Sequence, residues 1–144
     1  MPRANKDRPL LLDTHTWIWL LNGDEPLRSS KALAHIEEAA PSALLRVSAI
    51  SVWEVGMLEA KGRISLPMSC EAWVDQALNA PGIAMVPLSP EIALASSRLP
   101  GVFHGDPADR ILVATAWALE ADLVTRDRKI IEYGKSGYVS IVEF

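Results

Sequence analysis

Cysteine is almost absent from the sequence, with Cys70 the only one among 144 residues. A lone cysteine excludes a disulfide within the chain and a metal site built from several thiolates. It also fits a protein of a reducing compartment, so we expect a cytoplasmic location. No apolar run approaches the roughly 20 residues that a bilayer-spanning helix needs. Because Asp13 interrupts the first apolar run early, we expect neither a membrane segment nor a secretory signal.

Several enzyme signatures are missing as well. The chain has no GxSxG segment of a serine hydrolase, no phosphate-binding P-loop and no GxGxxG dinucleotide fingerprint. Cys70 has no histidine near it in sequence that would activate its thiol. The net charge of −4 argues against a protein that holds nucleic acid by a broad basic surface, although a metal in an acidic cleft would still attract a phosphate locally.

The composition is that of one ordinary globular domain, with 49% hydrophobic and 22% charged residues and no repeat or low-complexity tract. We expect residues 1–9, which are polar and contain two prolines, to form a loose N-terminal arm. Residues 10–144 are expected to form a single domain.

Apolar strand-like runs alternate with helical segments along the whole chain. Because these runs are continuous and do not alternate with polar residues, they predict an α/β fold with a mostly parallel central sheet covered by helices on both faces. The segments expected to form strands are 10–13, 44–49, 83–89, 121–127 and 138–144. The expected helices lie in segments 14–26, where Asn22 and Gly23 close a short helix, 29–40 with a serine cap, 51–63, 70–82, 90–101, 106–121 and 128–134.

Carboxylates recur where this fold would bind a ligand, beyond the carboxyl ends of the strands. Asp13 and Asp127 each follow an apolar strand, and Glu54 is expected in the first turn of helix 51–63. Asp106 and Asp109 stand three residues apart in the first turn of helix 106–121, so they share one face of that turn. Four segments thus bring acids to one edge of the sheet.

Each acid also has a local explanation. Asp13 would suit the cap of the following helix, and Asp106 is a favourable N-cap. Glu54 would pair reciprocally with Ser51 in a capping box, and Asp127 would suit a solvated turn. These explanations account for the acids singly but not for their recurrence at one edge.

A divalent cation would explain that recurrence. Clustered carboxylates repel one another and raise each other's pKa values, and a hard cation relieves the repulsion. Mg²⁺ and Mn²⁺ prefer oxygen ligands, and one or two such ions would activate water and polarise a phosphodiester. His15 and His104 lie beside the acids in sequence without an assigned role, whereas His35 is expected at the surface or in packing.

Three ordered segments resemble the PIN-domain nucleases, and most closely the VapC-type ribonuclease toxins of type II toxin–antitoxin systems: LLLDTHTWIWLL, VSAISVWEVGMLEAKGRI and HGDPADRILVATAWALEADLVTRDRKI. The resemblance runs from about residue 10 to the C-terminus. It implies a PIN-like α/β/α sandwich and a Mg²⁺- or Mn²⁺-dependent endoribonuclease that uses water to hydrolyse RNA.

The resemblance also carries site residues across. It implies that four acids bind the metal and carry catalysis, namely Asp13, Glu54, Asp109 and Asp127. Secondary candidates at the site are Asp106, Thr125 and Thr14. Three cations close to the acids in sequence are candidates for contacts with RNA phosphates, namely Arg110, Arg126 and Lys129.

The resemblance further implies a homodimer and a small cognate antitoxin that covers apolar helices. The tryptophans considered for such a surface are Trp17, Trp19, Trp53 and Trp73, with at least two of them expected in the core. A degenerate PIN-like scaffold without nuclease activity is the alternative. A phosphatase of the haloacid-dehalogenase type would need an aspartate where His15 stands, and a receiver domain would need adjacent acids after the first strand.

Overall fold

A central parallel sheet organises the computed structural model, which describes residues 7–144. Five strands pair in the spatial order β3-β2-β1-β4-β5, and every pairing is parallel. The prediction of an α/β fold is confirmed. The strands are β1 (Leu10–Leu12), β2 (Leu45–Ser48), β3 (Ile83–Val86), β4 (Asp122–Thr125) and β5 (Ile141–Glu143).

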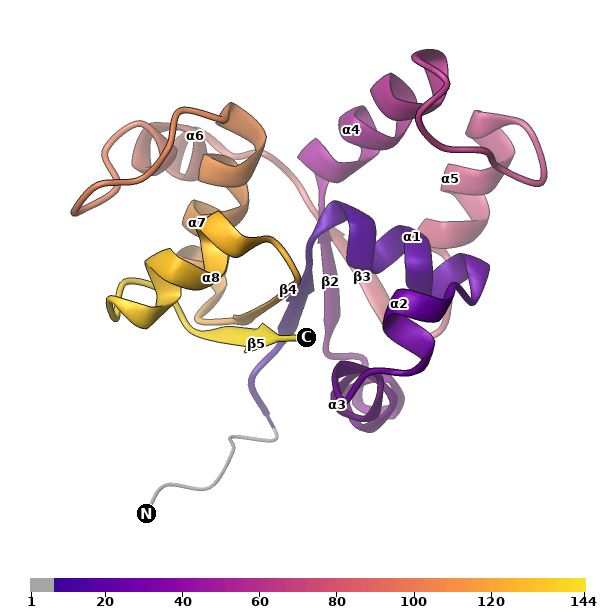
Figure 1. Cartoon of the computed structure of the whole chain (residues 1–144), viewed down its shortest axis with the longest axis horizontal. Helices are drawn as coiled ribbons and strands as arrows, with labels where there is room; N and C mark the ends of the chain where they lie inside the picture. Colours follow the sequence, from indigo (N-terminus) through magenta and orange to yellow (C-terminus); the bar gives the residue numbers. More distant parts are fainter. Residues whose placement is uncertain (1–6) are drawn as a thin grey trace.

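Helices cover both faces of this sheet and complete an α/β/α sandwich. Figure 1 shows α6, α7 and α8 on one side of the strands and α1 to α5 on the other. The first group is α6 (Pro90–Ser96), α7 (Pro107–Leu119) and α8 (Arg128–Lys135). The second is α1 (Thr14–Asn22), α2 (Glu25–Arg28), α3 (Ala32–Ala39), α4 (Ala49–Ala60) and α5 (Cys70–Leu78), with a short 3₁₀ turn, η1, at Ala40–Ser42. No helix in the described part of the chain is long and apolar enough to cross a membrane.

Strand β1 lies at the centre of both cores. Leu10 and Leu12 pack into the core on the α1–α5 side, whereas Leu11 packs into the core on the α6–α8 side. Burying each leucine contributes about 1.5–3 kcal/mol. The strand is therefore anchored from both faces, and so is the residue that follows it.

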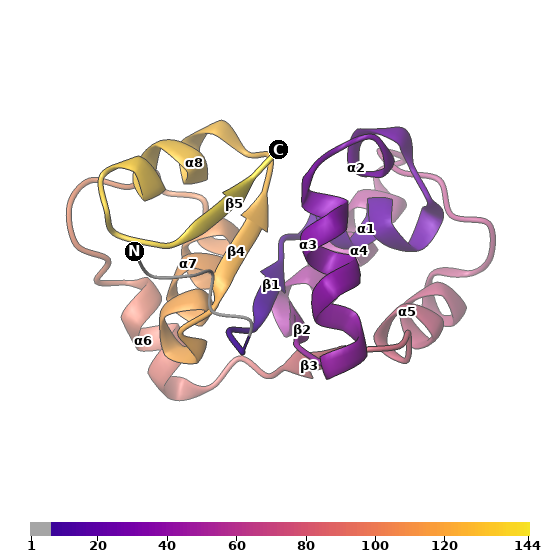
Figure 2. The ribbon, with the colours of Figure 1, turned by 90° about the horizontal axis from the view of Figure 1, so that it is seen from below.

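The order of the strands reverses beside β1, because β2 pairs with one of its edges and β4 with the other. Figure 2 shows these strands side by side, with helices on either side. The Asp13 N–H continues the β1–β4 pairing by donating to the Val124 carbonyl at 3.1 Å. Such a reversal point opens a crevice at the carboxyl ends of the strands.

The predicted end of the first helix at Asn22 and Gly23 is confirmed, because Gly23, with a φ of 68°, caps α1 before the short α2 begins. Two other local predictions differ from the structure. No serine side chain caps α3, because Lys31 occupies the N-cap position and the Ser30 hydroxyl donates to the Leu27 carbonyl of α2. The N-terminal arm lies largely outside the described residues, and its last part is not loose, since Arg8 pairs with Asp122 at 3.0 Å.

Candidate functional site

The crevice beside β1 is an acidic cleft of about 470 Å³. All five acids singled out from the sequence line it, together with residues from α1, α7 and the turn after β4. The structure therefore brings together the acids that were expected at the carboxyl edge of the sheet. The lining residues are Asp13, Thr14, His15, Trp19, Glu54, Asp106, Asp109, Leu112, Arg126 and Asp127.

Asp13 is buried at the junction of β1 and α1. Its Oδ1 accepts the Thr16 N–H at 2.8 Å, which caps α1, and its Oδ2 accepts the Thr125 hydroxyl at 2.5 Å. Burial raises the pKa of the Asp13 carboxyl, and these hydrogen bonds oppose the rise by favouring the charged form. Asp13 thus both caps α1 and lines the cleft, although the sequence suggested these two roles as alternatives.

Glu54 does not take part in a capping box. Helix α4 begins at Ala49, and its cap is Ser48, whose hydroxyl accepts the Ile50 N–H at 3.1 Å. Glu54 therefore lies beyond the first turn, and the predictions of a Ser51 cap and a first-turn Glu54 are wrong.

The Glu54 carboxylate is held from across the cleft instead. It accepts the Thr14 hydroxyl at 2.5 Å, and the Ser51 hydroxyl lies 2.9 Å from that of Thr14. Burial raises the pKa of Glu54, and the nearby Asp106 carboxylate adds to the rise. Thr14 thus orients an acid of another helix, whereas the capping of α1 belongs to Asp13.

Asp109 is a strongly perturbed acid of the cleft. Burial, followed by the charges of Asp106 and Asp127, raises its pKa to about 7. Asp106 caps α7 by accepting the Ala108 N–H at 2.9 Å, as its sequence position predicted. A pKa this high reflects a carboxyl group that is both buried and surrounded by other carboxylates.

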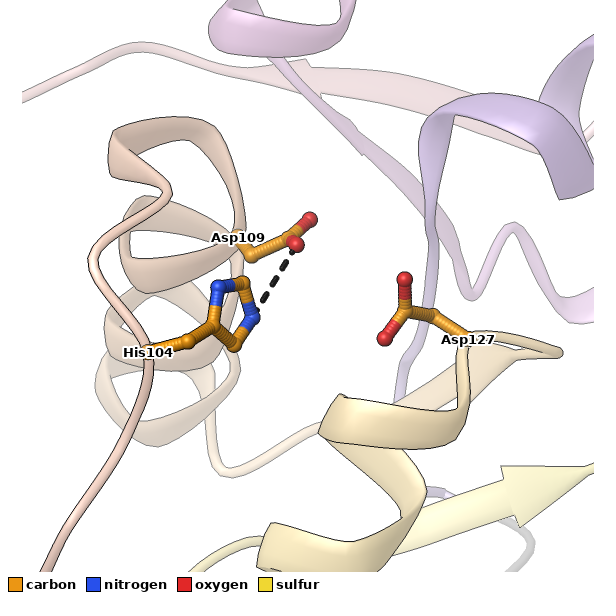
Figure 3. A group of neighbouring side chains, drawn as sticks. All are labelled: His104, Asp109 and Asp127. Carbon is orange, nitrogen blue, oxygen red and sulfur yellow. Dashed lines mark ion pairs between the residues drawn. The ribbon is translucent and has the colours of Figure 1, made fainter.

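Asp127 caps α8 through one oxygen only. Its Oδ1 accepts the N–H groups of Lys129 and Ile130 at 2.9 and 3.0 Å, so Asp127, although exposed, is the N-cap of α8. Its Oδ2 has no hydrogen-bond donor among residues 7–144, and Figure 3 shows the carboxylate directed toward Asp109 across a gap. A helix cap therefore leaves an oxygen available to a ligand in the cleft.

Known proteins match nearly the whole chain. The family model described as PIN domain matches residues 10–136. The chain belongs to the PIN domain family. It is also 37% identical over 121 residues to ribonuclease VapC22 of Mycobacterium tuberculosis, covering 84% of this chain and 88% of that protein.

Solved structures share the fold of this PIN domain at low sequence identity. A chain of VapBC2 from Rickettsia felis, bound to a promoter DNA fragment, matches with a TM-score of 0.67 and 16% identity, covering 94% of this chain and 98% of that one. A toxin–antitoxin complex from Klebsiella pneumoniae matches with a TM-score of 0.62 and 21% identity, covering 92% and 95%. These matches confirm the PIN-like architecture.

His104 joins the PIN-domain acids without having been assigned a role from the sequence. Its Nε2 lies 3.2 Å from Asp109 Oδ2, and one atom each of His104, Asp109 and Asp127 lies within 4.8 Å of the others (Figure 3). The contact with Asp109 falls outside hydrogen-bond geometry, so the buried Nε2 atom has no hydrogen-bond partner. The three residues form a group that could hold a metal ion.

The tautomer of His104 favours the carboxylates as the stronger ligands of that group. His104 Nδ1 accepts the Asp106 N–H at 3.3 Å, which places the proton of a neutral ring on Nε2. Nε2 would bind a metal only after that proton moved to Nδ1. The sequence signal for His104 was its position in HGDPADR, two residues before the α7 cap.

The three cations singled out from the sequence occupy different surroundings. Arg110 donates to the carbonyls of Ser96, Phe103 and His104 at 2.9–3.3 Å, so its guanidinium fastens the loop before α7. Arg126 lines the acidic cleft, and Lys129 lines an adjoining hollow. Only the latter two are placed to meet a ligand of the cleft.

The tryptophans considered for a partner surface also separate into two groups. Trp17 and Trp73 are buried and pack edge to face, with ring centroids 5.1 Å apart, which confirms core packing for two of the four. Trp53 on α4 is 60% exposed. Trp19 is half-buried and lines the acidic cleft.

Proposed function

We propose that this PIN domain is a Mg²⁺- or Mn²⁺-dependent endoribonuclease and the toxin of a type II toxin–antitoxin pair. The observation that carries the proposal is the convergence of five carboxylates in one cleft, where burial and the neighbouring negative charges raise the pKa of Asp109 to about 7. The 37% identity to a protein named ribonuclease VapC22 supports RNA as the substrate.

The donor atoms of the cleft fit a hard divalent cation. Carboxylate oxygens are the ligands that Mg²⁺ and Mn²⁺ prefer, and a cation would relieve the repulsion among the clustered carboxylates. We assign the cation ligands to Asp13, Glu54, Asp109 and Asp127. A bound cation supplies Lewis acidity toward water and toward the scissile phosphate.

The remaining residues of the cleft hold these acids in place. Thr125 and the Thr16 N–H orient Asp13 and favour its charged form, and Thr14 fixes Glu54. Asp106 sets the start of α7 and adds negative charge beside Asp109. Preorganised groups of this kind lower the cost of reaching the transition state because they need no rearrangement during the reaction.

Positive side chains at the rim would receive the RNA backbone. Arg126 lines the cleft itself, and Lys129 lines the hollow beside it. We assign both to RNA phosphates, which also reconciles an acidic protein with a polyanionic substrate. Arg110 holds the preceding loop and is not part of this assignment.

The proposed partners are a small antitoxin and a second copy of the chain. The matched solved structures include toxin–antitoxin complexes, and exposed apolar side chains are present on this chain. Three large ones are Trp53, Leu94 and Val102, with 60%, 53% and 96% of their surfaces exposed. A partner that covered them would remove apolar surface from water.

Substitution of Asp13 tests the proposed activity. Asp13→Asn keeps an oxygen to cap α1, so we expect a folded protein that no longer cleaves RNA in the presence of Mg²⁺ or Mn²⁺. Cleavage products of total RNA are sequenced from their ends after incubation with wild type, with this variant and with Asp75→Asn, which changes an exposed aspartate on α5.

The outcome separates an enzyme from a scaffold. Wild-type protein and Asp75→Asn are expected to produce the same cut ends, and Asp13→Asn none. Equal cleavage by all three proteins, purified in the same way, contradicts the assignment of Asp13. Calorimetric titration that detects neither Mn²⁺ nor Mg²⁺ binding to wild-type protein favours the degenerate scaffold.

A further inference from the structure

Two aromatic side chains of α1 form one wall of the acidic cleft. His15 and Trp19 both line the cavity, and their ring centroids are 5.6 Å apart at an interplanar angle of 48°. Their spacing of four residues places them on the same face of the helix. Neither residue has a part in the proposed handling of the cation or of water.

One ring of the wall is held in place by packing, and the other is exposed. Trp19 packs edge to face against Phe144, with centroids 6.0 Å apart and an interplanar angle of 82°, and belongs to the partly buried layer around the core. His15 is exposed. An immobilised indole with an accessible aromatic neighbour loses little conformational entropy when a flat ligand packs against it.

The wall reaches the acids at the centre of the cleft. His15 follows Asp13 by two residues, and it lines the same cavity as Asp13 and Glu54. A nucleotide whose phosphate lies at these acids would therefore have its own base, or that of its neighbour, beside the two rings.

The opposite end of the site is cationic. Arg128 and Lys129 line a hollow that shares Asp106, Asp109 and Asp127 with the cleft. Neither cation makes an ion pair within the part of the chain that the structure describes. The acids thus lie between an aromatic wall on α1 and a pair of free cations at the start of α8.

We propose that His15 and Trp19 form a base-binding wall, on which the nucleobase next to the scissile phosphate stacks, while Arg128 and Lys129 hold the backbone beyond the acids. This inference rests on the proposed ribonuclease function. Aromatic side chains, histidine included, stack on exposed RNA bases, and the interaction grows with the size of the base. The wall therefore favours a purine over a pyrimidine at that position.

Binding to an inactive variant tests the wall without interference from cleavage. With Asp13→Asn as the reference, fluorescence anisotropy measures the affinity for labelled oligoadenylate, oligouridylate and an abasic oligoribose phosphate. We expect the reference to bind these probes in decreasing order of affinity. His15→Ala and Trp19→Ala added to the reference should each weaken oligoadenylate binding about tenfold and leave abasic binding unchanged.

Matched variants separate stacking from charge and from damage to the fold. In the same background, His15→Phe keeps a ring without a charge, so it should preserve the preference for adenine. His35→Ala changes an exposed histidine that does not line the cleft, and it should bind like the reference. Because His15 is at the surface, its variants are informative even if Trp19→Ala unfolds.

Three results would contradict the proposed base-binding wall. If His15→Ala binds oligoadenylate as tightly as the reference does, His15 makes no contact with a base. An equal loss of abasic and oligoadenylate binding would make His15 a phosphate contact. Equal affinity of the reference for all three probes would show that bases are not bound. In each case the wild-type protein still cleaves RNA, whereas failure of the proposed function appears as absence of that cleavage.

Discussion

The hydroxyl of Thr125 donates a hydrogen bond to Asp13 Oδ2 at 2.5 Å and joins two residues that are 112 positions apart in sequence. Thr125 ends β4 and Asp13 follows β1, so the bond crosses the point where the order of the strands reverses. The same hydroxyl oxygen accepts the Asp127 N–H at 3.0 Å. One threonine thus fixes the relative positions of two acids of the cleft.

Thr125→Val should weaken both the fold and the cation site. Valine keeps the β-branched shape but removes the donor, so a buried carboxylate loses one of its hydrogen bonds and its pKa rises further. We expect the free energy of unfolding to fall by about 1–3 kcal/mol. Mn²⁺ affinity should fall by about tenfold or more. Urea denaturation and calorimetry measure the two effects.

Thr115→Val is the matched control for this substitution. Thr115 is also buried, but its hydroxyl donates to the Ile111 carbonyl of its own helix at 2.6 Å. Removing that bond should cost about 1 kcal/mol or less and leave Mn²⁺ affinity unchanged. Equal Mn²⁺ affinities of Thr125→Val and wild type would show that the Thr125 bond does not support the cation site.

The metal-free protein should become less stable as the pH rises from about 4 to 7. An aspartate has a pKa of about 3.9 in the unfolded chain, whereas that of Asp109 is about 7 in the fold. Between these pH values Asp109 holds a proton in the folded state that it has lost in the unfolded chain. The stability that the fold gains from this proton is fully present below about pH 4 and is lost as the pH rises through about 7. The slope from this one group is at most about 1.4 kcal/mol per pH unit.

Urea denaturation in EDTA at a series of pH values measures this slope. Asp13 and Glu54, whose pKa values are also raised by burial, act in the same direction. Asp109→Asn should flatten the profile, because the amide does not titrate. Stability that rises with pH over this range in wild-type protein would contradict a raised pKa for Asp109.

The sheet and the acidic edge were predictable because both depend on local patterns. Three successive leucines before Asp13 predict a buried strand with a carboxylate at its end, and the structure buries Leu10, Leu11 and Leu12 on alternating faces. Asp106 was predictable as a cap because aspartate before Pro107 favours a helix start. Parallel pairing then brings the strand ends together.

The partners of the acids were not predictable in the same way. Ser48 and Ser51 both precede helix-forming residues. The sequence pattern favoured Ser51 as the α4 cap, whereas the cap is Ser48, and Glu54 was therefore wrongly predicted to lie in the first turn. The contact from Thr14 to Glu54 spans 40 positions, and that from Thr125 to Asp13 spans 112. Such contacts follow from the packing of α1 against α4 and of β1 against β4, which no local pattern records.

Asp106→Asn should move cation binding to lower pH without abolishing it. The Asp106 carboxylate is the largest charged contribution to the raised pKa of Asp109, and asparagine retains an oxygen that can accept the Ala108 N–H and cap α7. The pKa of Asp109 should therefore fall toward its ordinary value. Because a carboxylate must be deprotonated to bind a cation, less proton competition remains near pH 6.

Calorimetric titration with Mn²⁺ from about pH 5 to 8 separates this effect from direct ligation. We expect the midpoint of the rise in affinity to shift to lower pH in Asp106→Asn, with an affinity near that of wild type at pH 8, where Asp109 is ionised in both proteins. Asp75→Asn, which removes an exposed charge on α5, should leave the midpoint in place. A loss of Mn²⁺ affinity of about 100-fold at pH 8 would instead indicate that Asp106 binds the cation directly. A lower pKa of Asp109 would not compensate for the loss of a carboxylate ligand.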